Sequence, residues 1–124
     1  MVNKSKLPKL KNRKDFEILS ETGCRVHIHS WLLFNFKENQ YQCLRCGWTI
    51  PKYVGTAVTR NRIRRWCREY FSEKRKNSWD PNIDLNVVLR RREKDFFKDL
   101  EYKEFKKILD KGVNKLEKQI GYGN

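Results

Sequence analysis

The segment between Val54 and Phe71 constrains the fold of this chain more than any other. Its apolar side chains recur at steps of three and four residues, at Ile63, Trp66, Cys67, Tyr70 and Phe71. Such steps place side chains along one stripe of an α-helix, which is typical of a helix packed on a core. The pattern therefore predicts a helix over Ala57–Ser72 with one buried side.

The opposite side of this helix is rich in arginine. It carries Asn61, Arg64, Arg65 and Arg68, and Arg60 and Arg62 flank it. No acidic residue occurs between Glu38 and Glu69, whereas a helix face that meets only solvent usually mixes both signs of charge. A guanidinium group can hold phosphate through two hydrogen bonds and can stack on bases. We therefore expect this side to bind a polyanion.

Size and charge indicate one basic domain over residues 1–124. The chain has 124 residues, a formal net charge of +14 and a pI near 9.9, which favours nucleic acid or an anionic membrane as partner. No apolar run approaches the roughly 20 residues that span a bilayer, and the first residues lack the apolar segment of a secretory signal. We expect a cytoplasmic protein that binds nucleic acid and no membrane.

The four cysteines are expected to be reduced thiols, because their number and spacing do not suggest a disulfide scaffold. Cys43 and Cys46 do have the spacing of a zinc site, which His27 and His29 could complete. On an extended strand, however, Cys43 and Cys46 point to opposite faces, and no second cysteine pair follows. Zinc is therefore the weaker alternative, and we assign no chemistry to the two histidines.

Hydropathy and turn residues outline the other elements. A mobile basic arm is expected at about residues 1–13. After it we expect a helix over Lys14–Thr22, one or two strands within Arg25–Phe36, a strand over Tyr41–Ile50, the arginine-rich helix, a strand over Ile83–Leu89 and a helix over about Glu101–Ile120. Alternation places Val26, Ile28, Leu32, Phe34 and Phe36 on one strand face, opposite His27, His29 and Trp31. The order α-β-β-(β)-α-β-α favours a small mixed sheet with helices on one side.

The arginine-rich helix also carries a recognisable motif. The signature of the bacterial ribonuclease P protein subunit closely resembles Gly55-x-Ala57-Val58-x-Arg60-Asn61-Arg62-Ile63-x-Arg65, followed by Arg68-Glu69-x-Phe71. Other segments resemble the family in the same order, namely Lys14-Asp15-Phe16 with Gly23, Trp31 to Phe36, and Asp84 to Arg90. The resemblance implies an α+β fold, an α/β sandwich of order α-β-β-β-α-β-α. Its mixed four-stranded sheet would contain a βαβ crossover of the uncommon left hand.

The resemblance also implies a function. Ribonuclease P removes the 5′ leader of precursor tRNA, and its RNA subunit carries out the hydrolysis with Mg²⁺ bound mainly by RNA and substrate. The protein subunit would bind ribonuclease P RNA and the single-stranded leader, without an organic cofactor or an obligate protein partner. By resemblance, the residues that face the catalytic RNA would be Arg60, Asn61, Arg62, Arg64, Arg65 and Arg68. Those that line a leader-binding cleft would be Phe16, Leu32, Phe34, Lys52, Arg90 and Arg91.

Several alternatives stay open at the level of sequence. Leu32 and Phe34 are equally compatible with a core position, because alternation does not say which sheet face is covered. The chain has Ser20 where the family often has an aromatic residue, and Lys52 alone where it often has several lysines, which leaves the base preference of leader binding open. A ribosomal or general RNA-binding protein is the main alternative function. A protein-only nuclease is weaker, since no carboxylate pair, activated nucleophile or metal cluster suited to that chemistry is evident.

Overall fold

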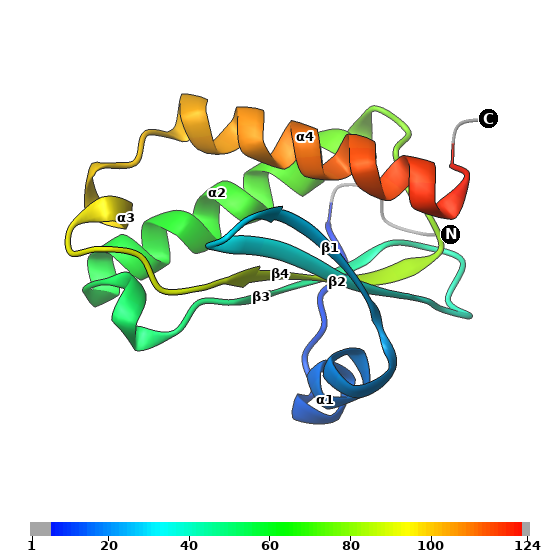
Figure 1. Cartoon of the computed structure of the whole chain (residues 1–124). Coiled ribbons are helices and arrows are strands. Elements are labelled where there is room, and N and C mark those ends of the chain that lie inside the picture. The colour runs from blue at the N-terminus through cyan, green and yellow to red at the C-terminus, as the bar shows by residue number, and fades with distance from the viewer. Residues whose placement is uncertain (1–5, 123–124) are drawn as a thin grey trace.

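Figure 1 shows one sheet with two long helices over one face and a short helix against the other. The computed structural model describes residues 6–122. In chain order its elements are α1 (Arg13–Thr22), β1 (Cys24–His29), β2 (Leu32–Glu38), β3 (Arg45–Thr49), η1 (Lys52–Val54), α2 (Ala57–Lys76), β4 (Ile83–Leu89), α3 (Phe96–Asp99) and α4 (Tyr102–Ile120). The predicted α+β class and the order α-β-β-β-α-β-α are confirmed, with η1 and α3 as short additions.

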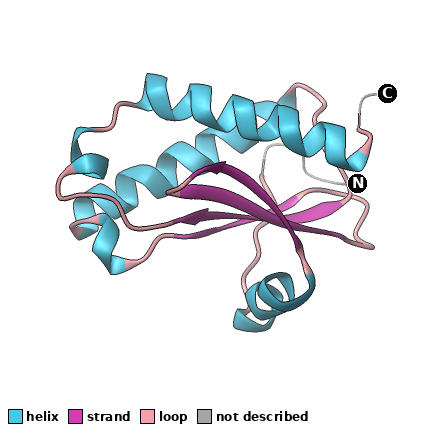
Figure 2. Ribbon diagram, in the orientation of Figure 1, coloured by secondary structure: helices cyan, strands magenta, loops and turns pink. Residues whose placement is uncertain are grey.

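The sheet is mixed and has the strand order β1-β2-β4-β3. β1, β2 and β4 pair antiparallel, whereas β3 runs parallel to β4. A parallel pair needs a crossover connection, and α2 provides it between β3 and β4 (Figure 2). The predicted mixed four-stranded sheet is thus confirmed. The prediction that helices cover only one side is wrong, because α1 packs against the opposite face.

α2 forms where the apolar stripe predicts it, and all five residues of that stripe are buried. Thr56 caps its first turn, because the Thr56 hydroxyl accepts the N–H of Thr59 at 3.2 Å. The helix ends at Lys76 rather than Ser72. Its extra turn is held by Arg75, which is 3% exposed, lies 3.6 Å from Asp80 and donates to the carbonyl of Lys6.

The main core lies between the sheet and the pair α2 and α4. All the residues predicted on one strand face are buried, namely Val26, Ile28, Leu32, Phe34 and Phe36. α4 approaches them closely through Gly112, where a Cβ atom would lie 2.7 Å from the ring of Phe34. On its other side the Phe34 ring meets Phe71 of α2 edge-on, with 6.2 Å between ring centroids. Phe34 is therefore enclosed by both long helices.

β3 is shorter than predicted and begins at Arg45 rather than Tyr41. The Asn39 side chain folds the preceding residues into a turn, in which its Oδ1 accepts the N–H of Tyr41 and its Nδ2 donates to the carbonyl of Cys43, both at 3.0 Å. Gln42 has a φ of 57°, which a strand does not allow. These side-chain bonds end the extended conformation, and hydropathy does not reveal them.

The segment Lys6–Leu10 is packed, which corrects the prediction of a mobile arm over residues 1–13. Leu7 and Leu10 are buried. Leu10 donates its N–H to the carbonyl of Cys46 at 2.8 Å, and Cys46 donates to the carbonyl of Pro8 at 3.0 Å. The segment thus runs along the outer edge of β3 and pairs backbone groups that the edge would leave open. Residues 1–5 of the predicted arm lie outside the described residues.

The expectation that Trp31 lies on an outer face with His27 and His29 is wrong in part, because Trp31 is buried although its ring stacks on His29 with 5.8 Å between ring centroids. Trp31 is buried and packs edge-on against Phe96 and Phe97 of α3, with ring centroids 5.0 and 5.5 Å away. The pairing of β1 with β2 shifts between His27 and His29, and Trp31 lies in the turn that follows. Strand alternation does not hold across such a shift.

We predict that Gly112→Ala lowers the free energy of unfolding by about 1–3 kcal/mol, the usual cost of overpacking a core. Alanine favours a helix by about 1 kcal/mol over glycine, so a net loss would mean that the contact with Phe34 dominates. Lys111→Ala changes an exposed neighbour and serves as the control. Denaturant unfolding of both variants provides the measurement, and a more stable Gly112→Ala protein would contradict the close packing.

Candidate RNA-binding surfaces

Five polar side chains of α2 form one surface patch, which we call the arginine face: Arg60, Asn61, Arg64, Arg65 and Arg68. Their contacts are local. Arg64 donates to Asn61 at 2.7 Å, Arg60 donates to the carbonyl of Gly55 at 3.2 Å, and Arg65 lies 3.9 Å from Glu69. Exposed short-range pairs of this kind are weak, so the guanidinium groups stay available to a phosphate.

Arg62 does not join the arginine face, although it belongs to the same motif. Its Nη2 donates to the carbonyls of Phe97 at 2.8 Å and Lys98 at 2.9 Å, at the end of α3. Its guanidinium also lies over the ring of Trp66, 5.1 Å from the centroid. Helices leave their last carbonyls without internal partners, and Arg62 supplies a donor for two of them. The structure therefore gives Arg62 a role in holding α3.

A cleft of about 390 Å³ lies between α1 and the sheet face that α2 and α4 do not cover. We call it the α1 cleft. Residues from α1, from the strands and from the end of β4 line it, among them Arg13, Phe16, Leu33, Asn35, Asn86 and Arg90. Of the residues predicted to line a leader cleft, the structure thus brings Phe16 and Arg90 together here.

Leu32 and Phe34 do not line the α1 cleft, so their predicted contact with the leader is wrong. Both side chains are 0% exposed and lie on the helix-covered face of β2. Because successive strand residues point to opposite faces, Leu33 and Asn35 line the cleft instead. Sequence reasoning missed both residues, and it also missed Asn86. The available signal was a single asparagine within each of two apolar runs, Leu32–Phe36 and Leu85–Leu89.

The Phe16 ring packs against the sheet at Gly47 of β3. A Cβ atom at Gly47 would lie 2.7 Å from the Phe16 ring, so only glycine leaves room for the ring there. Phe16 is half-buried, and its ring therefore has one side packed on β3 and another open to the cleft. An aromatic ring with an open side can stack on a base.

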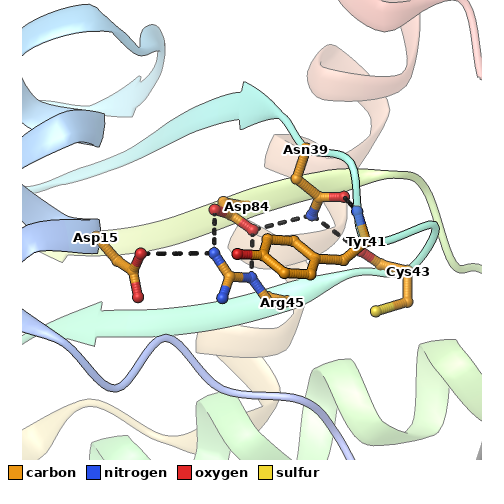
Figure 3. Close-up of polar contacts among 6 residues, drawn as sticks. All are labelled: Asp15, Asn39, Tyr41, Cys43, Arg45 and Asp84. Atoms are coloured by element: carbon orange, nitrogen blue, oxygen red, sulfur yellow. Dashed lines mark hydrogen bonds and ion pairs between the residues drawn. The ribbon is translucent and has the colours of Figure 1, made fainter.

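A network around Arg45 holds α1 on the sheet, as Figure 3 shows. Arg45 of β3 donates two hydrogen bonds to Asp84 of β4, at 2.7 and 2.6 Å, and its Nη2 lies 3.6 Å from the carboxylate of Asp15 on α1. The ring of Tyr41 covers the guanidinium at 4.0 Å. The hydrogen bonds that Arg45 donates to the Asp84 carboxylate raise the pKa of Arg45 above its ordinary value. Since Asp15 precedes Phe16, this network also positions the ring above the cleft.

Lys52, Arg90 and Arg91 gather near one end of the sheet, where all three are exposed. Tyr53 links η1 to the end of β4, because its hydroxyl lies 3.5 Å from the carbonyl of Leu89 and its ring lies 4.7 Å from the guanidinium of Arg91. Arg90 also lines the α1 cleft. The cationic residues therefore extend outward from the cleft.

The structure separates the four residues of the zinc alternative. His27 and His29 lie on β1, whereas Cys46 lies in β3 and Cys43 just before it. These strands are the two opposite edges of the sheet. Between residues 6 and 122 no group of three or more His, Cys, Asp and Glu side chains could hold a metal ion. Burial raises the pKa of the Cys46 thiol, which keeps it protonated and a poor ligand.

Comparison with known proteins identifies the family. The sequence model described as Ribonuclease P matches residues 5–117. The ribonuclease P protein component of Desulfatibacillum aliphaticivorans is 38% identical over 87 residues, which make up 70% of this chain and 72% of that protein. The chain belongs to the bacterial ribonuclease P protein family.

Other relatives agree in sequence and in fold. The ribonuclease P protein component of Fusobacterium nucleatum is 31% identical over 102 residues, or 82% of this chain and 90% of that protein. The structure of the Staphylococcus aureus RNase P protein matches with a TM-score of 0.76 and 25% identity, over 90% of this chain and 97% of that one. The RNase P protein from Thermotoga maritima matches with a TM-score of 0.71 and 23% identity, over 83% and 92% of the two chains. The resemblance inferred from the motif is thus confirmed over nearly the whole chain.

Membership of the bacterial ribonuclease P protein family defines the broad role of this protein. It is the protein subunit of a holoenzyme that processes tRNA, and the ribonuclease P RNA is its implied partner. This confirms the prediction that the chain is the protein subunit of the ribonuclease P holoenzyme. None of the helices in the described part of the chain is long and apolar enough to cross a membrane.

We predict that Arg62→Ala lowers the free energy of unfolding by about 1–3 kcal/mol, because the α3 carbonyls of Phe97 and Lys98 lose a charged donor. Arg65→Ala removes an exposed arginine from the same helix and should change stability by less than about 0.5 kcal/mol. Thermal unfolding compares the two variants, and amide exchange along α3 locates the effect. Equal melting temperatures with unchanged exchange would show that Arg62 does not hold α3.

Proposed function

We propose that this ribonuclease P protein binds the catalytic RNA through its arginine face and the single-stranded 5′ leader of precursor tRNA through the α1 cleft. The RNA subunit carries out the phosphodiester hydrolysis. The observation that most supports this division is the placement of the two surfaces, one on a helix covering the sheet and the other beneath its opposite face. Two RNA segments could then be held at once.

The arginine face suits the backbone of a folded RNA. Four of its five side chains are arginines, and an arginine can meet a phosphate with two parallel hydrogen bonds. Arg60 lies in the first turn of α2, where the partial positive charge of the helix terminus adds to the attraction, and Asn61 follows it directly. Each phosphate contact releases condensed counterions, so binding should depend on salt.

The α1 cleft suits one strand rather than a duplex. Its volume of about 390 Å³ is that of a small-ligand site and does not admit a double helix. Phe16 offers a stacking surface, a contact worth ~1–3 kcal/mol per base. Arg13, Arg25 and Arg90 line the same cleft and can meet the phosphates on either side of a stacked base. A stacking ring and basic side chains are the two components of single-strand binding without strict sequence preference.

We expect Mg²⁺ to be bound mainly by the RNA subunit and the substrate. Glu17 lines the α1 cleft, but its carboxylate is paired with Arg13 at 3.0 Å. Mg²⁺ binds through carboxylates and substrate phosphates, and here the carboxylate is already paired with a guanidinium group. This wall of the cleft therefore favours a phosphate over a metal ion.

Two further expectations follow from the family. The crossover through α2 should have the left hand, and the protein should act in the bacterial cytoplasm, where precursor tRNA is made. A ribosomal or general RNA-binding role is the alternative function. It would use the arginine face but would not require a leader-sized cleft.

The experiment that tests the proposal is reconstitution with a bacterial ribonuclease P RNA, followed by cleavage of precursor tRNA at low Mg²⁺. We predict no cleavage by the protein alone. Arg64→Ala combined with Arg68→Ala should weaken assembly and lower the slope of log affinity against log salt by up to about two units, one per phosphate lost. Lys107→Ala with Lys111→Ala removes the same charge from the exposed side of α4 and is the control.

Two outcomes would count against this assignment. If the α4 pair weakened assembly as much as the α2 pair, net charge rather than the arginine face would hold the RNA. If the wild-type protein failed to stimulate cleavage by any ribonuclease P RNA, the general RNA-binding role would be favoured.

We predict that Phe16→Ala weakens binding of precursor tRNA by about 1–3 kcal/mol, the cost of losing a stacking surface, with little effect on mature tRNA. Because the ring also packs on Gly47, the melting temperature has to be measured in parallel. Ile18→Ala, which trims an exposed apolar residue of the same helix, is the control. A large drop in melting temperature with equal losses for both tRNAs would make Phe16 a packing residue only.

A further inference from the structure

Three consecutive arginines follow β4, and we call Arg90–Arg92 the arginine exit. All three are exposed to solvent, yet each is held by another segment of the chain. The first donates its N–H to the carbonyl of Trp31 at 2.8 Å. The guanidinium group of the second lies 4.7 Å from the ring centroid of Tyr53, and that of the third lies 4.5 Å from the ring centroid of Phe96. The arginine exit therefore has a defined conformation in the free protein, although it is exposed.

Two of these contacts depend on α3. Phe96 is its first residue and provides the ring beneath Arg92, and Trp31 packs edge-on against two rings of α3. The connection to α3 is also short, because the N–H of Phe96 donates to the carbonyl of Glu93 at 3.1 Å. A displacement of α3 would thus be passed to the third arginine through the Phe96 ring and to the first through the Trp31 carbonyl.

The position of α3 depends in turn on α2. A helix of four residues is too short to be stable by itself. One of its residues, Phe97, is 2% exposed and is anchored in the core. Arg62 of α2 donates from one nitrogen, Nη2, to the carbonyls of Phe97 and Lys98 at 2.8 and 2.9 Å. Carbonyls at the end of a helix lack an internal partner, so Arg62 fixes the end of α3 against α2.

The guanidinium group of Arg62 is directed toward the protein rather than toward a ligand. Its Nε atom is buried, its Nη2 atom makes both bonds to α3, and the group lies 5.1 Å from the ring centroid of Trp66. A guanidinium group engaged in this way has few donors left for a phosphate. The arginines of the arginine face make only local contacts, so Arg62 differs from its neighbours in what it can hold.

We propose that Arg62 is a positioning residue for substrate binding, which acts through α3 to fix the arginine exit toward the 5′ leader of precursor tRNA. The inference rests on the proposed binding of the leader in the α1 cleft, which Arg90 lines. Without Arg62 the arginine exit keeps its charge but loses its fixed orientation. Ordering long side chains at an interface opposes binding, so arginines that are already held bind a phosphate more tightly than mobile ones.

The test uses the holoenzyme reconstituted with a bacterial ribonuclease P RNA, and it measures assembly separately from the binding of precursor and mature tRNA. Arg62→Met removes the donor and keeps an unbranched side chain. It should weaken the binding of precursor tRNA by about fivefold or more, as for residues coupled through shared contacts, while assembly and the binding of mature tRNA change by less than about twofold. Arg64→Met makes the same substitution on the arginine face and should instead weaken assembly. Lys107→Met removes one charge from the exposed side of α4 and is the control for net charge.

A double-mutant cycle distinguishes positioning from a general loss of structure. When all three residues of the arginine exit are replaced by alanine, Arg62→Met should weaken the binding of precursor tRNA by less than a further factor of about two, because the groups that it positions are absent. Arg62→Lys should restore the binding of precursor tRNA to within about threefold of wild type, since one lysine Nζ can replace the single Nη2 donor. Phe96→Leu removes the ring beneath Arg92 and leaves Arg62 intact. It should also weaken the binding of precursor tRNA but not of mature tRNA, which keeps the test valid if Arg62→Met folds poorly.

The outcomes separate this inference from the function on which it rests. If precursor tRNA binds equally to the wild-type and Arg62→Met holoenzymes, while the leader still raises affinity, Arg62 is not a positioning residue. A loss of the same size in the alanine background would overturn the inference too, and so would a loss of assembly as large as that of Arg64→Met. A leader that adds no affinity in the wild-type holoenzyme would instead refute the proposed binding of the leader, and this inference with it.

Discussion

The apolar stripe of α2 has to be buried, and its burial against the sheet decides where the rest of the helix points. Ile63, Cys67 and Phe71 are fully buried, so the residues on the opposite side of the helix must face water. Those residues are mostly arginines. A chain with a net charge of +14 repels itself when it becomes compact, and the apolar contacts offset that repulsion while they fix the guanidinium groups in one direction. The arginine face is in this sense a consequence of core packing.

The opposite face of the sheet is held by a different kind of contact. α1 buries Leu19 and packs Phe16 on Gly47, and the pair Arg45 and Asp84 anchors it through Asp15. The Arg45 and Asp84 side chains are only 17% and 16% exposed, and a partly buried pair with two hydrogen bonds is held more firmly than a surface pair. α1 is nevertheless too short to cover the whole face. The uncovered part is the α1 cleft.

Local patterns predicted the parts of this structure that depend on local periodicity. The stripe of α2, the boundaries of β4 and the helical spacing of α4 all follow from the spacing of apolar residues, and the motif within α2 identified the family. The remaining features depend on contacts between distant segments. Alternation in β2 separates Leu32 and Phe34 from Leu33 and Asn35, but only the packing of α4 on Phe34 decides which pair faces the two long helices. The bonds from Arg62 to α3 and the docking of Lys6–Leu10 on β3 likewise join residues far apart in sequence.

β2 connects the two candidate RNA surfaces, because its residues alternate between them. Phe34 packs against Phe71 of α2 and against Gly112 of α4, whereas Asn35, the next residue, lies on the floor of the α1 cleft. A disturbance of the Phe34 packing therefore reaches the helix that carries the arginine face and also the strand that forms the cleft. A change at Asn35 or Asn86 alters the cleft with no direct contact to α2. A variant that loses RNA binding at both surfaces is therefore expected to have a defect in the core. A variant that loses binding at one surface alone is expected to have a defect at that surface.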